Sequence, residues 1–383
     1  MPTKLLPLRI AILTSVHAPL DVRIFQKEAS ALAAAGHKVT LFARDRPGAA
    51  AEIETRGVRF VALHSGPSRL ARVGLWKQIL GQLRTLDVDA WHFHDPELLP
   101  LAVVARALLR RRVALVYDAH EDLPKDILEK HWIPQRTRRF VSWLADRVER
   151  WGAGRCDLVI AATDSIGARM ATCAPKTVVV HNYPLPLESA MPDHAARPVR
   201  AIFAGGLSRK RGVMELVEAM RLVQTPNLEL HLLGDFLNRA FEAELRAACG
   251  PNVFVHGEVP FAEVAGHLLS SHIGVVTFRP VPNHVEALPN KLFEYMRAGL
   301  AILASDFALW RPLVVGTGCG VVVDPSNPIA IAAALDALAA DAAGRQQMGE
   351  RGVACVRDRF SWSVAEAVLI DAYAALDRGA PAG

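Results

Sequence analysis

Short apolar segments of strand length alternate with helical segments along the whole chain, and this alternation limits the fold more than any other feature of the sequence. The first half has predicted strands at residues 8–14, 38–43, 58–63, 90–94, 113–118, 157–162 and 177–180. The second half has them at residues 199–204, 228–233, 253–256, 273–278, 301–304 and 320–323. Strands that alternate with helices predict an α/β fold, in which helices cover both faces of doubly wound parallel sheets.

The length of the chain indicates that this pattern is distributed over two domains. Its 383 residues exceed a typical domain of about 100–200 residues. The alternation stops in a proline-rich segment, residues 181–198, and then restarts. We therefore predict two Rossmann-like domains, an N-terminal one at residues 1–183 and a C-terminal one at residues 184–361, that face each other across a cleft.

The sequence predicts a cytoplasmic protein with reduced thiols. No apolar run approaches the roughly 20 residues that a membrane-spanning helix needs. Residues 1–14 lack the apolar core and the cleavage site of a signal peptide. The five cysteines are scattered and form no C-x-x-C pair, which disfavours a disulfide or zinc framework.

Charge is distributed unevenly between the two halves. Residues 1–183 hold 27 Lys and Arg against 18 Asp and Glu, whereas the remainder holds 17 against 21. Segments 69–86 and 130–140 interleave basic and aromatic residues, so they could lie on an anionic membrane or could be ordinary solvated helix faces. An anionic acceptor would also explain the basic half. No nucleic-acid partner is expected, because the sequence contains no recognised binding module.

The segment 284–299 carries the most specific chemistry. Glu286 and Glu294 flank Pro289-Asn290-Lys291, which predicts a helix start, and Gly299 predicts the helix end. The helix N-terminus and Lys291 would attract an anion, and each carboxylate can accept hydrogen bonds from two neighbouring hydroxyls. The segment thus offers a carboxylate, an anion pocket and a second carboxylate in that order, which matches the sugar, diphosphate and ribose of a sugar nucleotide. A capped surface helix remains the alternative.

A glycine-rich basic loop, residues 205–212, follows a predicted strand and opens a helix. Its glycines permit close backbone approach, and its cations could neutralise a departing diphosphate. The loop matches neither the P-loop nor the dinucleotide-binding pattern. We expect Arg211 to be the principal phosphate contact, ahead of Arg209 and Lys210. The alternative is a solvated basic turn.

Polar residues also follow the strands of the first half, where open parallel sheets bind their ligands. We select His17, Asp21, His120 and Glu121 as acceptor-side candidates. Side chains alternate along a strand, so His92 and His94 share a face, and only His94 is expected to reach the rim. There, His94 could contact a transferred sugar or transfer a proton, or it could simply be hydrogen-bonded in a loop.

We predict no metal site. The histidines lie in separate loops without a compact ligand motif. Asp87-Val88-Asp89 resembles a D-x-D metal motif, but it precedes a strand and so lies at the wrong edge of the sheet.

Together these segments resemble the GT-B fold glycosyltransferases of family 4 (glycosyl transferases group 1). The resemblance covers nearly the whole chain. It rests on residues 35–40, 92–97, 203–212, 231–234, 256–257, 289–299 and 360–362. The resemblance implies that the last helix, residues 362–378, packs back on the first domain.

The resemblance also implies site roles for a retaining transfer from a nucleotide-diphosphate sugar, with a UDP- or GDP-sugar as donor and no required cofactor or metal. Glu286 would hold the transferred sugar and Glu294 the ribose. Arg211 and Lys291 would meet the diphosphate, and His94 would lie beside the sugar. These four, Glu286, Arg211, Lys291 and His94, are the predicted catalytic residues. The predicted donor contacts are Gly206, Arg209, Lys210, Arg211, Gly234, Asn290, Lys291, Leu292 and Glu294.

Two departures from the family pattern are visible. The glycine pair after the first strand is absent, since residues 15–21 read Ser-Val-His-Ala-Pro-Leu-Asp. Gly206 stands where the family has an arginine. Our hypothesis is that Arg209 or Lys210 replaces the missing cation.

The sequence thus predicts a retaining glycosyltransferase that builds a polysaccharide or glycolipid. The acceptor would be a saccharide or lipid-linked, and the enzyme would associate peripherally with the inner face of the cell membrane. A sugar-nucleotide epimerase of the same fold and a non-catalytic nucleotide-sugar-binding protein are the alternatives.

Overall fold

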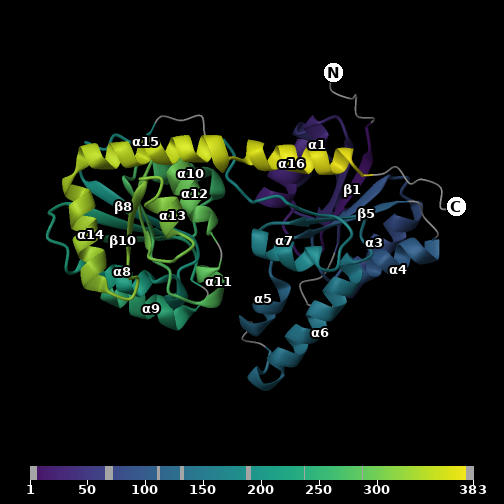
Figure 1. The fold of residues 1–383 in the computed structure, drawn as a ribbon, viewed down its shortest axis with the longest axis horizontal. Coiled ribbons are helices and arrows are strands. Elements are labelled where there is room, and N and C mark those ends of the chain that lie inside the picture. The colour runs from purple at the N-terminus through teal and green to yellow at the C-terminus, as the bar shows by residue number, and fades with distance from the viewer. Residues whose placement is uncertain are drawn as a thin grey trace. The chain divides into compact units, whose positions relative to one another are not determined.

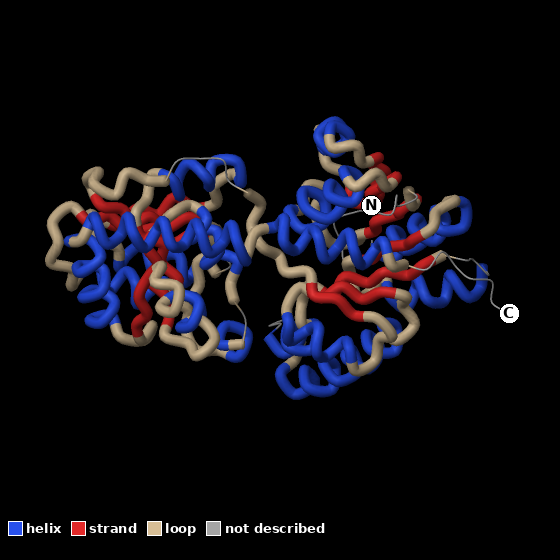
Figure 2. The backbone as a smooth tube through the Cα atoms, turned by 45° about the horizontal axis from the view of Figure 1, so that its top comes forward, coloured by secondary structure: helices blue, strands red, loops and turns tan. Residues whose placement is uncertain are grey.

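The structure is a computed structural model that describes residues 7–64, 72–109, 113–129, 133–186, 191–236, 238–286 and 288–376. The chain divides into two compact units (Figure 1). Unit 1 comprises Met1–Asn182 together with Trp362–Gly383, and unit 2 comprises Tyr183–Ser361. Each unit has a parallel sheet at its centre, with helices on both faces (Figure 2).

Unit 1 is built on a seven-stranded parallel sheet with the order β3-β2-β1-β4-β5-β6-β7. Its strands are β1 (Arg9–Leu13), β2 (Lys38–Arg44), β3 (Arg59–Leu63), β4 (Ala90–Phe93), β5 (Ala114–Ala119), β6 (Leu158–Ala161) and β7 (Thr177–Val179). Its helices are η1 (Val22–Ala29), α1 (Ser30–Ala34), α2 (Ala49–Thr55), α3 (Arg72–Thr85), α4 (Leu99–Leu109), α5 (Leu123–Glu129), α6 (Gln135–Ala153), α7 (Asp164–Ala171) and α16 (Trp362–Ala374).

Unit 2 is built on a six-stranded parallel sheet with the order β10-β9-β8-β11-β12-β13. Its strands are β8 (Val199–Ala204), β9 (Leu228–Leu233), β10 (Val253–Gly257), β11 (Ile273–Val276), β12 (Ala301–Ser305) and β13 (Gly320–Val323). Its helices are η3 (Arg209–Arg211), α8 (Val213–Met220), α9 (Arg239–Ala248), α10 (Phe261–Leu269), α11 (Pro282–Val285), α12 (Asn290–Arg297), α13 (Arg311–Val314), α14 (Pro328–Ala340) and α15 (Ala342–Arg359).

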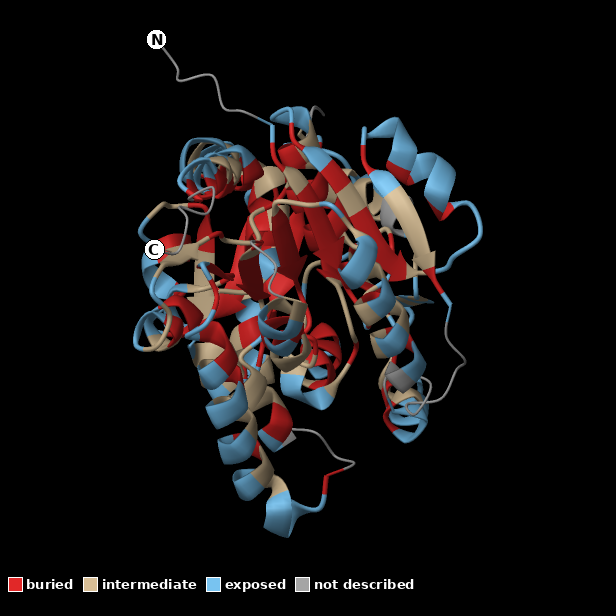
Figure 3. Ribbon diagram, turned by 90° about the vertical axis from the view of Figure 1, so that its right-hand side faces the viewer, coloured by how far each residue is buried: buried red, intermediate tan, exposed pale blue. Residues whose placement is uncertain are grey.

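Burial explains why the strands are nearly continuous apolar runs. A parallel sheet with helices on both faces has no solvated side, so both sets of alternating side chains must be apolar. Strands β4, β6 and β12 are accordingly buried at every position. Figure 3 shows the strands of unit 1 as a buried layer beneath helices whose outer faces are exposed. The predicted fold class, two doubly wound parallel sheets, is confirmed.

The strand order locates the ligand-binding edge of each sheet. In unit 1 the order reverses between β1 and β4, and in unit 2 it reverses between β8 and β11. Ligands of open α/β sheets bind at the carboxyl ends of the strands beside such a reversal. The loops that follow these four strands are therefore the ones to search for a site.

Several helices differ from the sequence prediction. Between β1 and β2, where the alternation predicts a helix, the chain forms a π-helix, η1, and then continues as α1. Asp21 caps η1, because its Oδ1 accepts the main-chain N–H groups of Arg23 and Ile24 at 2.8 and 2.9 Å. No helix was predicted at the positions of α2, α5, α10, α11 and α13.

The last helix, α16, belongs to unit 1, where it packs against η1, α1 and β7. Figure 1 shows it beside α1. Trp362 lies under the Lys27 ammonium group, which is 5.8 Å from the ring centroid. Tyr373 is buried, and its hydroxyl hydrogen-bonds His92 Nδ1 at 2.8 Å. Within the described ranges, no helix combines the length and the apolar character needed to cross a membrane.

Candidate active site

Helix α12 of unit 2 has the start and end that the sequence predicts. Pro289 is its N-terminal cap residue, and Gly299 adopts the left-handed conformation just beyond its end, with φ 75°. Leu292, Phe293 and Met296 are buried, as expected for the core-facing side. Leu292 therefore packs in the core with its side chain, so any donor contact from it would come from its main chain.

Tyr295 fixes the position of α12 against the sheet. Its side chain is fully buried, and its hydroxyl accepts a hydrogen bond from the main-chain N–H of Ala204 at 2.7 Å. A Cβ atom at Gly274, in β11, would lie 2.5 Å from the Tyr295 ring, so only glycine leaves room for it. This anchoring holds the start of α12 beside the loop that follows β8.

Two cations converge on that loop. A Cβ atom at Gly205 would lie 2.1 Å from Lys291 Nζ, and one at Gly206 would lie 2.8 Å from Arg211 Nη1. The Arg211 guanidinium donates to the carbonyl of Gly206 at 3.0 Å. The sequence placed Lys291 on a polar face, whereas the structure packs it, half-buried, against the loop.

The electrostatics of this cation pair favour an anion. Burial lowers the pKa of Lys291 to about 8, and the positive charge of Arg211 adds to the effect. Burial also lowers the pKa of Arg211. In the described part of the chain, neither cation has a carboxylate at ion-pair distance, although Glu294 lies close enough to favour the charged form of Lys291. A bound anion would stabilise the charged forms of both Lys291 and Arg211 and so offset the cost of burying them.

Gly234 contributes to the same edge through its backbone. It has φ 138°, and a Cβ atom there would lie 2.2 Å from the carbonyl oxygen of Gly205. An L-residue with a side chain would be strained at this φ and would push the Gly205 loop away. Gly234 thus seats the loop that holds the cations. Whether it also touches a donor stays a prediction.

Arg209, one of the two candidates to replace the missing family arginine, points away from Gly206 in this structure. The Arg209 guanidinium is ion-paired with Glu244 and lies over the ring of Phe241, 5.1 Å from its centroid, so it points toward α9. Lys210 is exposed, and its carbonyl accepts the main-chain N–H of Arg279 at 2.9 Å. Arg211 is therefore the cation of this loop that reaches Gly206.

The two predicted glutamates occupy different settings. Glu294 is half-buried one turn into α12. Glu286 is exposed and follows α11, and the next residue, Ala287, lies outside the described residues. Asn290 is exposed in the first turn of α12. Their contacts with a donor remain predictions.

Unit 1 has a separate pocket of about 590 Å³ at its own carboxyl edge. Its polar lining includes His17, Asp95, His120 and Glu121, and its apolar wall comes from residues 141, 144 and 148 of α6. Three of the four predicted acceptor-side residues thus lie together. The fourth, Asp21, serves mainly as the cap of η1.

His17 and His120 form the polar end of this pocket. Their Nε2 atoms are 3.2 Å apart, and His17 Nε2 also lies 3.4 Å from Asp95 Oδ1. Burial disfavours the charged form of His120, but the hydrogen bond and charge of Asp118 outweigh it and raise the pKa of the imidazole. His120 therefore binds a proton more readily than a free imidazole does.

The expectation that His94 reaches the rim is wrong. Its side chain is 0% exposed, its Nδ1 lies 3.0 Å from Asp118 Oδ2, and its ring stacks on that of His92 with centroids 4.4 Å apart. Burial lowers the pKa of His94, which outweighs the opposing effect of Asp118. His94 thus lies, neutral, at the floor of the pocket, and His17 and His120 take the exposed positions.

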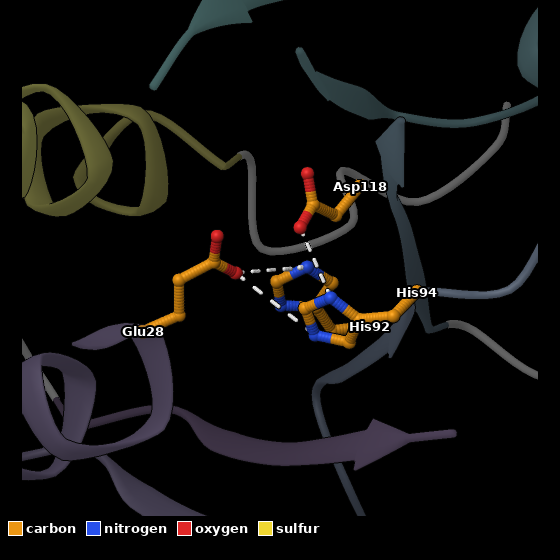
Figure 4. A group of neighbouring side chains, drawn as sticks. All are labelled: Glu28, His92, His94 and Asp118. Carbon is orange, nitrogen blue, oxygen red and sulfur yellow. Dashed lines mark hydrogen bonds and ion pairs between the residues drawn. The ribbon is translucent and has the colours of Figure 1, made fainter. Parts of the chain in front are cut away.

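Sequence reasoning missed the buried charges behind His94. Arg23 donates from Nε and Nη2 to the two oxygens of Asp118 at 2.7 and 2.8 Å. Burial alone would raise the pKa of Asp118, but Arg23 and the two neighbouring imidazoles hold it well below its usual range. Glu28 completes the group (Figure 4). A signal was present, because Arg23 and Glu28 fall beside Ile24 and Phe25, which predict the buried side of that helix.

Comparison with known proteins identifies the family. Residues 22–183 match the family described as Glycosyltransferase Family 4, and residues 198–341 match Glycosyl transferases group 1. The chain belongs to these GT-B glycosyltransferases.

Individual relatives agree with this family. The D-inositol 3-phosphate glycosyltransferase of Xylanimonas cellulosilytica is 29% identical over 187 residues, which span 47% of this chain and 43% of that protein, less than half of either. The structure of Anabaena Alr3699/HepE in complex with UDP-glucose has a TM-score of 0.73 at 16% identity, over 96% of this chain and 99% of that one. Sucrose-phosphate synthase from Thermosynechococcus elongatus has a TM-score of 0.70 at 18% identity, over 96% and 98%. At these identities, the two structures show a shared fold.

Proposed function

We propose that this glycosyltransferase moves a sugar from a nucleotide-diphosphate sugar to a saccharide or lipid-linked acceptor, with retention at the anomeric carbon. The observation that carries the proposal is the convergence of Lys291 and Arg211 on Gly205 and Gly206. Two cations that have no carboxylate of the described residues at ion-pair distance, beside a helix N-terminus, suit a diphosphate.

The donor pocket would use these groups in order along the nucleotide. The diphosphate lies on the glycine loop between Lys291 and Arg211. Glu294, one turn further along α12, accepts the ribose hydroxyls, and Glu286 holds the transferred sugar. A UDP-sugar is the preferred candidate, since the Anabaena neighbour was solved with UDP-glucose, and a GDP-sugar is the alternative.

Lys291 and Arg211 would also promote the departure of the nucleotide diphosphate from the sugar. As the sugar–oxygen bond breaks, negative charge builds up on the departing diphosphate, and fixed cations aimed at that position stabilise it. We infer that these side chains replace a divalent metal at the donor. Retention is inferred from the family resemblance, with the acceptor attacking on the face that the leaving group vacates.

The acceptor would bind in the pocket of unit 1. Its wall from α6 is apolar, and its His17–His120 end is polar, which fits a lipid-linked or glycolipid acceptor whose hydroxyl meets an imidazole. His120, poised by Asp118, is the candidate to accept the hydroxyl proton.

We also propose that unit 1 lies on an anionic membrane surface through α6. Arg136, Phe140, Trp143, Arg147 and Trp151 recur at spacings of three and four, so they form one stripe along the helix. All five are exposed, including Phe140 at 63% and Trp143 at 53%. Interleaved aromatic and basic side chains suit the headgroup layer of anionic lipids. The enzyme would then act at the inner face of the cell membrane.

The predicted segment 69–86 does not support membrane docking in the same way. Residues 69–71 lie outside the described residues. In α3, Trp76 is half-buried and packs against the core of unit 1, so it does not offer an aromatic anchor at the surface.

The test of the donor site is calorimetric titration of UDP, GDP and ADP into the wild type and two matched variants. Arg211→Ala removes the cation over Gly206, whereas Arg209→Ala removes its neighbour that is paired with Glu244. We expect the first to weaken binding of the preferred nucleotide at least about tenfold, since a charge-assisted hydrogen bond contributes roughly 1.5–3 kcal/mol. The second should bind like the wild type.

Two further outcomes would overturn parts of the proposal. Equal losses in the two variants would refute the assignment of the site to Arg211. Full turnover by Glu286→Ala, measured as release of nucleotide with any acceptor, would refute its role at the transferred sugar. Failure of the protein to bind anionic vesicles at low salt would refute the membrane assignment and leave the donor site standing.

A further inference from the structure

A buried group of Glu28, His92, His94 and Asp118 lies behind the pocket of unit 1 (Figure 4). Glu28 comes from η1, the histidines come from β4 and the residue after it, and Asp118 comes from β5. One potential ligand atom of each lies within 4.8 Å of all the others. None of these side chains is exposed to solvent.

Three of these groups have polar atoms without hydrogen-bond partners. The Oε2 atom of Glu28 and the Nε2 atoms of His92 and His94 are buried and accept or donate no hydrogen bond. A buried polar atom without a partner costs roughly 1–3 kcal/mol, so three such atoms at one point require an explanation.

The unpaired atoms face one another at a separation that suits a shared ion. Glu28 Oε2 lies 3.6 Å from His92 Nε2 and 3.9 Å from His94 Nε2 (Figure 4). These distances are too long for hydrogen bonds. Ligand atoms on a tetrahedral zinc ion, with bonds of about 2.0–2.1 Å to nitrogen and oxygen, are roughly 3.3–3.4 Å apart. The two separations from Glu28 Oε2 would need to shorten by only about half an ångström or less.

The other nitrogen of each histidine already has the partner that a metal-bound imidazole normally has. His92 Nδ1 is hydrogen-bonded to the hydroxyl of Tyr373 at 2.8 Å, and His94 Nδ1 to the carboxylate of Asp118 at 3.0 Å. Such outer partners fix the ring orientation and leave Nε2 for the metal. Residues i and i+2 of a strand share a face, so both Nε2 atoms point toward Glu28.

The hydrogen bonds of Arg23 leave the inner oxygen of Glu28 free to bind an ion. The Arg23 guanidinium donates hydrogen bonds to both oxygens of Asp118 and, at 3.0 Å, to the carbonyl of Val180. Arg23 Nε also lies 3.1 Å from Glu28 Oε1, which is the remote oxygen and not the one that faces the imidazoles. Asp118 therefore serves as the outer partner of His94, and Glu28 Oε2 is the carboxyl oxygen that faces both imidazoles.

We propose that Glu28, His92 and His94 bind one divalent transition-metal ion, with Zn²⁺ favoured by two imidazoles and one carboxylate. The ion would hold η1 against β4 beneath the His17–His120 pair. Because the side chains are fully buried, the metal is structural and does not touch a substrate. This replaces the sequence prediction of no metal, and it is independent of the donor site in unit 2.

The experiment measures metal content of the full chain after incubation with Zn²⁺ and removal of the excess by gel filtration. We expect about one Zn²⁺ per wild-type chain, and a higher melting temperature than for protein prepared with a strong chelator. Glu28→Gln and His92→Gln keep the shape of their side chains, and each should lose at least about tenfold in zinc affinity.

Two controls separate this site from other histidines. His120→Gln changes a neighbouring imidazole outside the set and should retain the ion. His256→Ala disrupts a surface group in unit 2, where His231 Nδ1 lies 3.0 Å from His256 Nε2, and should also leave the buried ion in place. Loss of the ion in His256→Ala alone would assign the binding to that surface and overturn the proposal.

A spectroscopic measurement covers the case in which the variants do not fold. Co²⁺ replaces Zn²⁺ in tetrahedral sites and gives visible absorption there, so the His256→Ala protein loaded with Co²⁺ should be coloured. No bound metal and no visible absorption in that protein would overturn the proposal. A proton shared between Glu28 and the imidazoles would then explain how these groups are held together.

Discussion

Lys291→Met should stabilise the free protein while weakening nucleotide binding, because the structure holds this ammonium group where only a ligand compensates its burial. Burial and Arg211 lower the pKa of Lys291 from 10.5 to about 8. At about 1.36 kcal/mol per pKa unit, this corresponds to roughly 3 kcal/mol at pH 7. Methionine keeps the apolar stem and removes the charge.

The sign of the effect depends on pH. A lysine whose folded pKa is depressed destabilises the folded state fully below pH 8, because the unfolded chain then holds the proton more readily. The cost fades as the pH rises from about 8 to 10.5, where the unfolded lysine also loses its proton. The stabilisation by Lys291→Met should therefore be largest at pH 7 and small above pH 10.5.

Differential scanning calorimetry at pH 7 and near pH 10.5, combined with titration of UDP, measures both effects. For a domain of about 150–250 residues, 1 kcal/mol shifts the melting temperature by roughly 2–4 °C, so the unit 2 transition should rise by up to about 10 °C at pH 7. Affinity for the nucleotide should fall at least about tenfold. Arg357→Met, which removes an exposed cation of α15, is the control and should shift neither value appreciably. A lower melting temperature at pH 7 with unchanged nucleotide affinity would refute the reasoning.

Three more substitutions test the packing around both sites. Gly205→Ala would place a methyl group 2.1 Å from Lys291 Nζ at a φ of 134°. We therefore expect at least tenfold weaker UDP binding by calorimetry, and unchanged affinity would contradict the assignment of the diphosphate to this loop. Tyr295→Phe removes the hydroxyl that accepts the main-chain N–H at the end of β8, which should cost about 1–3 kcal/mol in urea unfolding; a negligible loss would show that this bond does not anchor α12. Asp118→Asn removes the charge that raises the pKa of His120, so the NMR titration of that imidazole should move to lower pH, and an unmoved midpoint would exclude Asp118 as the cause.

Features that depend on local periodicity were predictable from the sequence. The alternation of strands and helices yielded both parallel sheets, because a strand buried on both faces must be a short apolar run. Pro289 and Gly299 marked α12 because each has a backbone conformation that suits a helix boundary. The glycine-rich loop was located by its position between a strand and a helix, and the role of Arg211 as its phosphate contact stays a prediction.

Features that depend on register between distant segments were not predictable. Three adjacent cations follow β8, and the sequence does not reveal that Arg209 turns toward Glu244 while Arg211 turns toward Gly206. The π-helix η1 was also missed, because its pattern of buried residues resembles that of an ordinary helix.

The sequence by itself determined the family, the two parallel sheets and the segments that carry polar chemistry at the strand ends. The tertiary structure alone decided which of those groups are buried and paired. The sequence predicted His94 and Lys291 as exposed polar residues, whereas packing places the first, buried, at the floor of the pocket and the second against Gly205. The physical reason is that burial and charge pairing join residues far apart in the chain, such as Arg23 and Asp118, whereas periodicity reports only on neighbours along one element.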